Sequence, residues 1–225
     1  VEAAGLAGPD FIILDTEHGP ASLQTLHQHV RAARAGGIAA LVRVPGVEAS
    51  GIASALDTGA DGVQVPDICT AEQARAAVDA ARFHPLGQRG VCRFVRAASF
   101  GSVPAEQYFR EANEALLVLQ VEGRQGVDNL EEILAVPGFD VLFVGPYDLS
   151  QSVGRPGEVS APEVLELIAQ ISAKATARGV RLGVFCDSPE NARRFRDSGF
   201  RYLSYSVDVN IFLQACRQLG DMLRG

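Results

Sequence analysis

The stretch FIILDTEHGP at residues 11–20 joins an apolar run to three residues that can carry charge, Asp15, Glu17 and His18. An imidazole titrates near neutral pH, and a carboxylate can accept a proton or bind a cation. Together these groups can move a proton to or from a substrate. Such chemistry needs a rigid element to hold it, and the apolar run just before these residues predicts a buried strand in that role.

Three later apolar runs also lead into polar residues of catalytic types. Arg43 lies in LVRVPG, Gln120 and Glu122 follow LLVL, and Asp148 follows LFVGP. Side chains alternate in direction along a strand, so Gln120 and Glu122 share one face. Singly, each polar residue has an ordinary structural explanation, such as a solvated ion pair or a turn cap. Their recurrence at the ends of these runs predicts one shared site.

The lysine content narrows the chemistry. Lys174 is the only lysine of the 225 residues, and it lies within a helix-like segment, ISAKATARG, rather than at the end of an apolar run. An enzyme that forms a carbanion beside a carbonyl spreads the charge through a lysine imine or a bound metal ion. The metal route remains, and two carboxylates with an amide are oxygen ligands suited to Mg²⁺ or Mn²⁺.

The elements that must position these residues alternate along the whole chain. Alanine-rich amphipathic segments separate seven β-rich runs: FIIL, AALVRV, DGVQV, ALLVLQV, DVLFV, RLGVF and YLSYSV. This alternation predicts an α/β fold with a parallel sheet, and no GxGxxG follows the first run to favour an open dinucleotide-binding sheet. The initial VEAAGLAGPD is typical of the end of a helix. We therefore expect a (β/α)8 TIM barrel whose N-terminal strand is missing from this chain, with catalytic groups at the carboxyl ends of the strands.

Several helix boundaries carry signals. Helices are expected over residues 21–35, 71–82, 129–136, 162–178 and 189–197. Thr70 with Gln73, and Ser160 with Glu163, have the spacing of capping boxes. Ser188 precedes a proline suited to the first helical turn.

Composition limits the function classes. With 47% hydrophobic residues, the chain suffices for one barrel domain spanning residues 1–225. Its 27 acidic and 20 basic residues form no basic stripe, so no nucleic acid partner is expected. No apolar run approaches the roughly 20 residues that cross a bilayer, so no membrane partner is expected. The four cysteines form no CxxC pair and predict reduced thiols in the cytoplasm.

Longer motifs resemble those of the HpcH/HpaI aldolases, which include the 4-hydroxy-2-oxoheptanedioate and 2-dehydro-3-deoxyglucarate aldolases. The patterns EH-G-P, P-G-RG and GP-DLS-S-G-PG occur in order within DFIILDTEHGP, FHPLGQRG and LFVGPYDLSQSVGRPG, and the resemblance covers essentially the whole chain. It implies a phosphoenolpyruvate/pyruvate-type barrel and a class II, metal-dependent aldolase, which is a carbon–carbon lyase. Such an enzyme reversibly cleaves a 4-hydroxy-2-oxo acid into pyruvate, or a related 2-oxo acid, and an aldehyde through a metal-stabilised enolate.

The resemblance implies a role for each matching residue. Glu122 and Asp148 fall on the ligands of a divalent metal ion, Mg²⁺, Mn²⁺ or Co²⁺. His18 falls on the catalytic histidine, and Arg43 on the arginine that binds the keto oxygen and stabilises the enolate. Asp57 falls on an aspartate that reaches the histidine of a neighbouring subunit. The base stays open between His18, assisted by Asp57, and a metal-bound water.

Further positions are implied to form the substrate pocket and its surroundings. Asp15 and Glu17 hydrogen-bond metal waters or orient His18. Aromatic rings at positions 147 and 185 predict a smaller or flatter aldehyde acceptor. The substrate-binding residues implied by the resemblance are Gln120, Gly145, Pro146, Tyr147 and Phe185, with the backbone of 145–148 receiving the pyruvate carboxylate.

The resemblance also implies partners and leaves alternatives. The family assembles as a homohexamer built from dimers that exchange C-terminal helices, and residues 209–223 are amphipathic enough to do so. One alternative keeps the enolate chemistry but applies it to oxaloacetate decarboxylation or to citrate-lyase-like thioester cleavage. The other is a barrel that binds a 2-oxo acid without catalysis.

Overall fold

The computed structural model describes residues 1–224 and contains one parallel sheet whose strands follow chain order. The seven strands are β1 (Phe11–Asp15), β2 (Ala39–Arg43), β3 (Gly62–Val65), β4 (Leu116–Val121), β5 (Val141–Val144), β6 (Arg181–Cys186) and β7 (Tyr202–Tyr205). All seven β-rich runs of the sequence are therefore strands, as predicted. The predicted barrel fold is confirmed, with seven strands in the described chain.

The sheet curls until its first and last strands face each other. Phe11 of β1 stacks on Tyr202 of β7 with ring centroids 4.4 Å apart, although no hydrogen-bonded ladder joins these two strands within residues 1–224. Side chains from β2, β4, β5 and β7 fill the interior around Val118 and Phe143. The interior is thus a packed core, and only the strand ends are open to a ligand.

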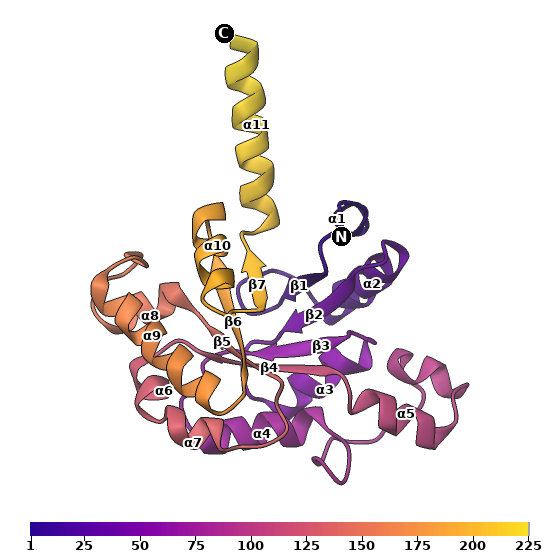
Figure 1. The fold of residues 1–225 in the computed structure, drawn as a ribbon. Helices are drawn as coiled ribbons and strands as arrows, with labels where there is room; N and C mark the ends of the chain where they lie inside the picture. Colours follow the sequence, from indigo (N-terminus) through magenta and orange to yellow (C-terminus); the bar gives the residue numbers. More distant parts are fainter. Residues whose placement is uncertain (225) are drawn as a thin grey trace.

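Helices cover the outer face of the sheet (Figure 1). They bury a second, larger apolar cluster against the strands, including Val63, Leu119 and Ile171. The helices are α1 (Glu2–Leu6), α2 (Leu23–Ala35), α3 (Ala49–Asp57), α4 (Ala71–Ala81), α5 (Ala105–Ala112), α6 (Arg124–Asp128), α7 (Leu130–Leu134), α8 (Pro146–Ser152), α9 (Pro162–Ala177), α10 (Pro189–Asp197) and α11 (Asp208–Arg224), with a 3₁₀ helix η1 at Arg96–Gly101.

Side-chain caps fix the start of two helices as the sequence predicts. At α4, Thr70 Oγ1 accepts from the Gln73 backbone N–H at 3.3 Å, and Gln73 Oε1 accepts from the Thr70 N–H at 3.1 Å. At α10, Ser188 Oγ accepts from the Asn191 N–H at 3.2 Å. Each cap satisfies a backbone donor that the first helical turn leaves free.

The capping box predicted at Ser160 is wrong. Helix α9 begins at the proline after Ala161, and Ala161 makes no side-chain cap. With Ala161 as the N-cap, Glu163 is the second helical residue and not the third, and it accepts a hydrogen bond from Arg155 at 3.2 Å. The helix predicted at 129–136 is also shorter, and a separate helix, α6, precedes it.

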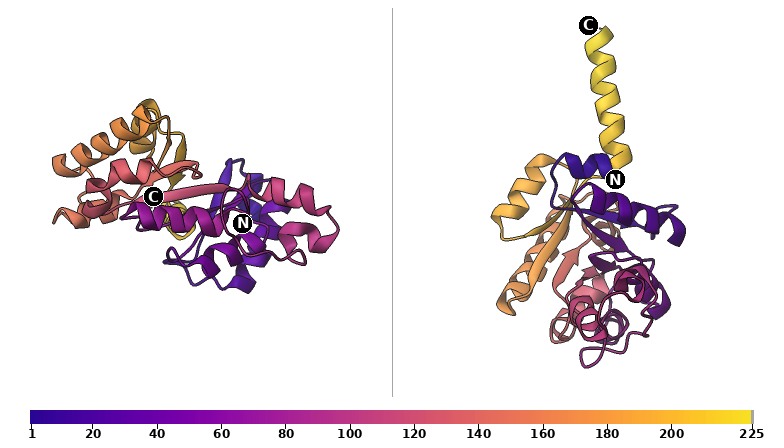
Figure 2. Two further views of the ribbon diagram at one scale, coloured as in Figure 1. Left: turned by 90° about the horizontal axis from the view of Figure 1, so that it is seen from below. Right: turned by 90° about the vertical axis from the view of Figure 1, so that its right-hand side faces the viewer.

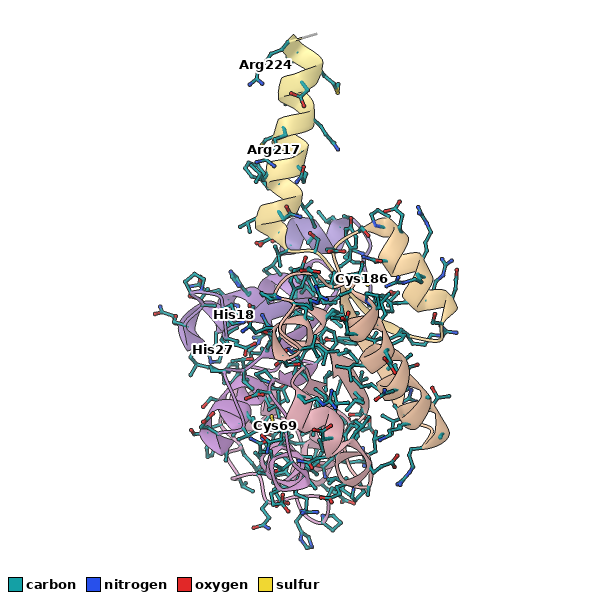
Figure 3. All side chains as sticks on the ribbon, turned by 90° about the vertical axis from the view of Figure 1, so that its left-hand side faces the viewer. His18, His27, Cys69, Cys186, Arg217 and Arg224 are labelled. Carbon is teal, nitrogen blue, oxygen red and sulfur yellow. The ribbon has the colours of Figure 1, made fainter. Side chains whose placement is uncertain are left out.

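The last helix, α11, extends away from the barrel (Figure 1), and the N-terminus lies near its base (Figure 2, right). None of its residues is buried by the rest of the described chain. The side chains of Arg217 and Arg224 extend from it with no other element beside them (Figure 3). Within residues 1–224, no helix has the length and apolar character needed to cross a membrane.

Candidate active site

Arg43 and Asp15 meet at the carboxyl ends of β2 and β1, where the sheet register pairs them directly. Arg43 Nε donates to Asp15 Oδ1 at 2.9 Å, and Nη2 donates to Oδ2 at 2.6 Å. Arg43 Nη1 also lies 2.9 Å from Glu17 Oε2. This two-point ion pair fixes the plane of the guanidinium as well as its position.

The two carboxylates beside Arg43 differ in their electrostatics. Burial alone would raise the pKa of Asp15, but the hydrogen bonds and charge of Arg43 outweigh it, so that pKa lies below its ordinary value. For Glu17, burial prevails over the attraction of Arg43 and the pKa is raised. Glu17 Oε2 is buried and accepts no hydrogen bond in the described structure, although Arg43 Nη1 forms an ion pair with it. Glu17 therefore has unused capacity to accept a proton or a hydrogen bond.

His18 follows β1 and lies at the surface (Figure 3) with a side chain that is 70% exposed. Its backbone N–H donates to Asp15 Oδ1 at 3.5 Å, and the Glu17 N–H donates to the same oxygen at 3.0 Å. Asp15 thus anchors both the arginine and the turn that carries the histidine. The imidazole Nε2 lies 3.9 Å from Glu17 Oε2, so the ring remains free to meet a substrate.

A line of hydrogen bonds between three uncharged side chains crosses the barrel interior and ends on the carboxylate of Glu122. The Tyr202 hydroxyl donates to Gln64 Oε1 at 3.1 Å, Gln64 Nε2 donates to Gln120 Oε1, and Gln120 Nε2 donates to Glu122 Oε2. The other carboxylate oxygen of Glu122 accepts from the backbone N–H of Asp67 at 3.0 Å. Every side chain in the line is at least nine-tenths buried, so the line fixes the Glu122 carboxylate in one orientation.

The sequence reasoning missed three members of this arrangement. Gln64 could have been identified from the sequence. In the run DGVQV it is the only polar residue that follows the initial aspartate. The roles of Tyr202 and of the Asp67 backbone could not have been identified in this way, because they depend on how the sheet closes. Asp67 adopts φ 51°, a left-handed conformation that turns its N–H toward Glu122.

Glu122 has a strongly perturbed carboxyl group. It is 7% exposed, and burial, with repulsion from Asp148 and Glu17, raises its pKa to about 7. Gly145 leaves the space that the carboxylate occupies, because a Cβ there would overlap Glu122 Oε2 and lie 2.9 Å from Glu122 Cβ. A divalent cation relieves the repulsion between the buried carboxylate of Glu122 and the exposed one of Asp148, so the residues present fit such an ion.

The donor set that the chain offers to a cation is small. No group of three or more His, Cys, Asp or Glu side chains in residues 1–224 is arranged to hold a metal ion. Glu122 and Asp148 supply two carboxylates, and Asp148 lies in the first turn of α8, directly after Tyr147. Mg²⁺ and Mn²⁺ accept such a partial set, because substrate and water oxygens complete their coordination.

Tyr147 and Phe185 form an aromatic edge beside Asp148. Their ring centroids lie 6.0 Å apart at an interplanar angle of 67°. Phe185 comes from β6 and packs against the interior cluster, whereas Tyr147 is 45% exposed. The structure therefore brings both predicted acceptor residues together at the rim of the barrel.

Asp57 lies apart from the other predicted residues, at the end of α3. Its Oδ1 accepts from Arg89 Nη2 at 2.6 Å, and the Arg89 side chain is 1% exposed. Within residues 1–224, Asp57 forms neither a hydrogen bond nor an ion pair with His18. The predicted contact with the histidine of a neighbouring subunit stays a prediction.

Comparison with known proteins gives consistent matches. A family profile described as HpcH/HpaI aldolase/citrate lyase matches residues 1–215. The 5-keto-4-deoxy-D-glucarate aldolase of Citrobacter koseri is 38% identical over 224 residues, which are 99% of this chain and 86% of that protein.

Two solved structures superpose closely. A HpcH/HpaI aldolase/citrate lyase family protein from Burkholderia cenocepacia J2315 has a TM-score of 0.94 at 37% identity, covering 100% of this chain and 89% of that chain. The HpcH/HpaI aldolase of Desulfitobacterium hafniense DCB-2 has a TM-score of 0.92 at 29% identity, covering 99% of this chain and 86% of that chain.

These matches confirm the predicted fold and the predicted enzyme class, an aldolase. The similarity extends along nearly the whole chain, including the segments that carry Arg43, Glu122 and Asp148. The chain belongs to the HpcH/HpaI aldolase/citrate lyase family.

Proposed function

We propose that this aldolase reversibly cleaves a 4-hydroxy-2-oxo acid of the deoxyglucarate type to pyruvate and an aldehyde. The substrate class rests on the similarity to 5-keto-4-deoxy-D-glucarate aldolases. The observation that carries the chemistry is the convergence of a clamped arginine, Arg43, with the paired carboxylates Glu122 and Asp148 at one end of the barrel. The oxyanion that develops on the keto oxygen of a 2-oxo acid is stabilised by a positive charge held close to it, and Arg43 supplies that charge at this end of the barrel.

Glu122 and Asp148 would hold the divalent cation, Mg²⁺, Mn²⁺ or Co²⁺. When bound, the cation supplies Lewis-acid polarisation of the keto oxygen. Gln120 and the Asp67 backbone N–H each donate to one oxygen of Glu122, which fixes the carboxylate and leaves one electron pair of each oxygen for the cation.

The side chains of the chain itself account for the proton and charge movements of cleavage. Arg43 donates to the keto oxygen while Asp15 holds its plane. A base takes the proton of the C4 hydroxyl, the C3–C4 bond breaks, and its electron pair passes into the C2–C3 enolate as the aldehyde forms. Protonation at C3 then gives pyruvate. His18, exposed and adjacent to Glu17, is the residue we assign to the C4 proton, with Asp57 of a neighbouring subunit orienting it.

The remaining predicted residues bind and shape the substrate. The backbone of Gly145, Pro146 and Tyr147 receives the carboxylate of the 2-oxo acid, and Phe185 lies beside the aldehyde. The four cysteines are free thiols in the described structure, which supports the predicted cytoplasmic location.

We also propose that the protein is a homohexamer whose subunits exchange α11. Seven large apolar residues of α11 are 46–79% exposed, and a monomer rarely leaves so much apolar surface in contact with water. Phe212, at 71% exposure, is the largest of them. Light scattering after size exclusion should show a hexamer for the wild type and smaller species for Phe212→Glu, with Arg217→Glu as the matched helix control. A monomeric wild type would reject the assembly.

The activity test is pyruvate release, coupled to lactate dehydrogenase, from a panel of 4-hydroxy-2-oxo acids with Mg²⁺ or Mn²⁺. We expect release that stops with EDTA and in Glu122→Ala, while Glu132→Ala, an exposed residue, behaves as wild type. Oxaloacetate is included to detect a decarboxylase. Turnover of oxaloacetate with no release from any hydroxy acid would reject the aldolase assignment.

A further inference from the structure

Asp187, directly after β6, holds the Tyr147 side chain. The Tyr147 hydroxyl donates to Asp187 Oδ2 at 3.0 Å, and Asn191 Nδ2 donates to Asp187 Oδ1 at 3.0 Å. Asn191 lies in the first turn of α10, whose start is fixed by the Ser188 cap. The carboxylate is therefore tied on one side to a capped helix and on the other to the tyrosine that precedes Asp148.

Little space remains between the Tyr147 ring and α10. The pocket lined by Tyr147, Phe185, Asp187 and Phe195 has a volume of only about 10 Å³. A water molecule needs roughly that much, so this hollow leaves the ring little room on the side of α10. On its other side the ring meets the edge of Phe185 at 6.0 Å. While Asp187 accepts its hydroxyl, Tyr147 is confined to one position at the rim.

A side chain that is 45% exposed would otherwise be free to change rotamer. The bond to Asp187 ties the hydroxyl and so selects the rotamer in which the ring stands beside Phe185. The hydrogen bonds of Asn191 and Tyr147 lower the pKa of Asp187 despite some burial, which keeps the acceptor ionised at neutral pH. An ionised acceptor makes the stronger hydrogen bond.

We propose that Asp187, backed by Asn191, is a positioning residue that fixes Tyr147 against Phe185, and that the resulting aromatic wall restricts the aldehyde to short acceptors. This inference rests on the proposed aldolase function. It extends the acceptor-size role from the two aromatic rings to the polar pair of Asp187 and Asn191, which no feature of the sequence had indicated.

The test compares aldol addition of pyruvate to glycolaldehyde and to hexanal in wild type, Asp187→Ala, Asp187→Asn and Tyr147→Phe. Glu190→Ala, which changes an exposed residue of α10, is the matched control. We expect Asp187→Ala and Tyr147→Phe to raise the kcat/KM ratio of hexanal to glycolaldehyde by about tenfold, mainly through a lower KM for hexanal. Asp187→Asn keeps an acceptor oxygen and should retain the wild-type ratio, as should Glu190→Ala.

Exchange of the pyruvate methyl protons with D₂O gives the second readout, because it needs the enolate but no aldehyde. The Asp187 variants should exchange at the wild-type rate. An unchanged ratio in Asp187→Ala, with wild type active on both aldehydes, overturns the role of Asp187 alone. A wild type that adds pyruvate to no aldehyde, yet exchanges methyl protons, overturns the proposed aldolase function instead.

Discussion

Asp15 clamps Arg43 across paired positions of β1 and β2, with Nε–Oδ1 and Nη2–Oδ2 distances of 2.9 and 2.6 Å. Asp15→Asn removes the charge and one of the two acceptors but keeps the side-chain volume. We expect kcat/KM for pyruvate release to fall by about 10- to 100-fold, since the guanidinium loses its fixed plane. In the double variant with Arg43→Lys, the loss should be less than the product of the single losses, because both substitutions disrupt the same Asp15–Arg43 ion pair. Fully multiplicative losses would show that the clamp does not act through Arg43.

The buried carboxyl of Glu122 makes stability depend on pH in the cation-free protein. Its pKa rises from 4.5 to about 7 on folding, so between these values the folded state holds a proton that the unfolded chain releases. The free energy of unfolding should therefore fall as pH rises from about 4.5 to about 7, by an amount on the order of 3 kcal/mol. Urea titrations at several pH values should show this slope in wild type and a weaker one in Glu122→Gln. An equal slope in Glu122→Gln would assign the effect to other groups, and Glu132→Gln serves as the surface control.

The same carboxyl couples cation binding to proton release. Below its pKa of about 7 the site must lose a proton to accept Mg²⁺ or Mn²⁺. Affinity should rise by about tenfold per pH unit up to this value and then level off. Calorimetry in buffers of different ionisation enthalpy should record close to one proton released at pH 6 and few at pH 8. Affinity that does not change with pH would contradict a role for Glu122 as a ligand.

Gly145 provides the space that the Glu122 carboxylate occupies. In Gly145→Ala the new methyl group would displace the carboxylate, because a Cβ there overlaps Glu122 Oε2. We expect cation affinity to fall by about 10- to 100-fold and the free energy of unfolding to fall by about 1–3 kcal/mol. Gly123→Ala is the matched control, since a Cβ at Gly123 meets no atom within 4 Å. Comparable losses in both variants would point to a general backbone effect.

Tyr202 begins the line of hydrogen bonds that ends on Glu122. Tyr202→Phe removes only the donor to Gln64 Oε1 and leaves a buried acceptor unpaired. The expected cost is about 1–3 kcal/mol in the free energy of unfolding, together with weaker cation binding. Tyr205→Phe, at a 47% exposed position of the same strand, should leave both measurements unchanged. If stability falls but cation affinity does not, the line does not orient Glu122.

The strands, and the location of the site at their carboxyl ends, were predictable from the sequence. Each strand is an apolar run bounded by glycine, proline or charged residues. Strands of a parallel sheet are buried on both faces, and they therefore appear in the sequence as such runs. The polar residues that follow them converge because all strands point the same way. That geometry places Arg43 beside Asp15 without any knowledge of the rest of the fold.

Other features were not predictable because they depend on contacts between distant segments. The pairing of Asp57 with Arg89 and the bond of Tyr147 to Asp187 join residues 32 and 40 positions apart that share no periodic pattern. The wrong capping box at Ser160 has a local cause, since the helix begins at the proline after Ala161, one residue later than the spacing of Ser160 and Glu163 requires. Short helices such as α6 and α8 also lack the length that makes amphipathic periodicity visible.

The bond from Tyr202 to Gln64 spans 138 residues, whereas each ladder of the sheet joins strands that are consecutive in the chain. Contacts between consecutive units close small loops and can form early, but this one must wait until the last strand arrives. We therefore expect the orientation of Glu122 to be completed at the end of folding. A refolding chain should regain its helical signal before it regains cation binding, so the site reports on closure of the whole barrel.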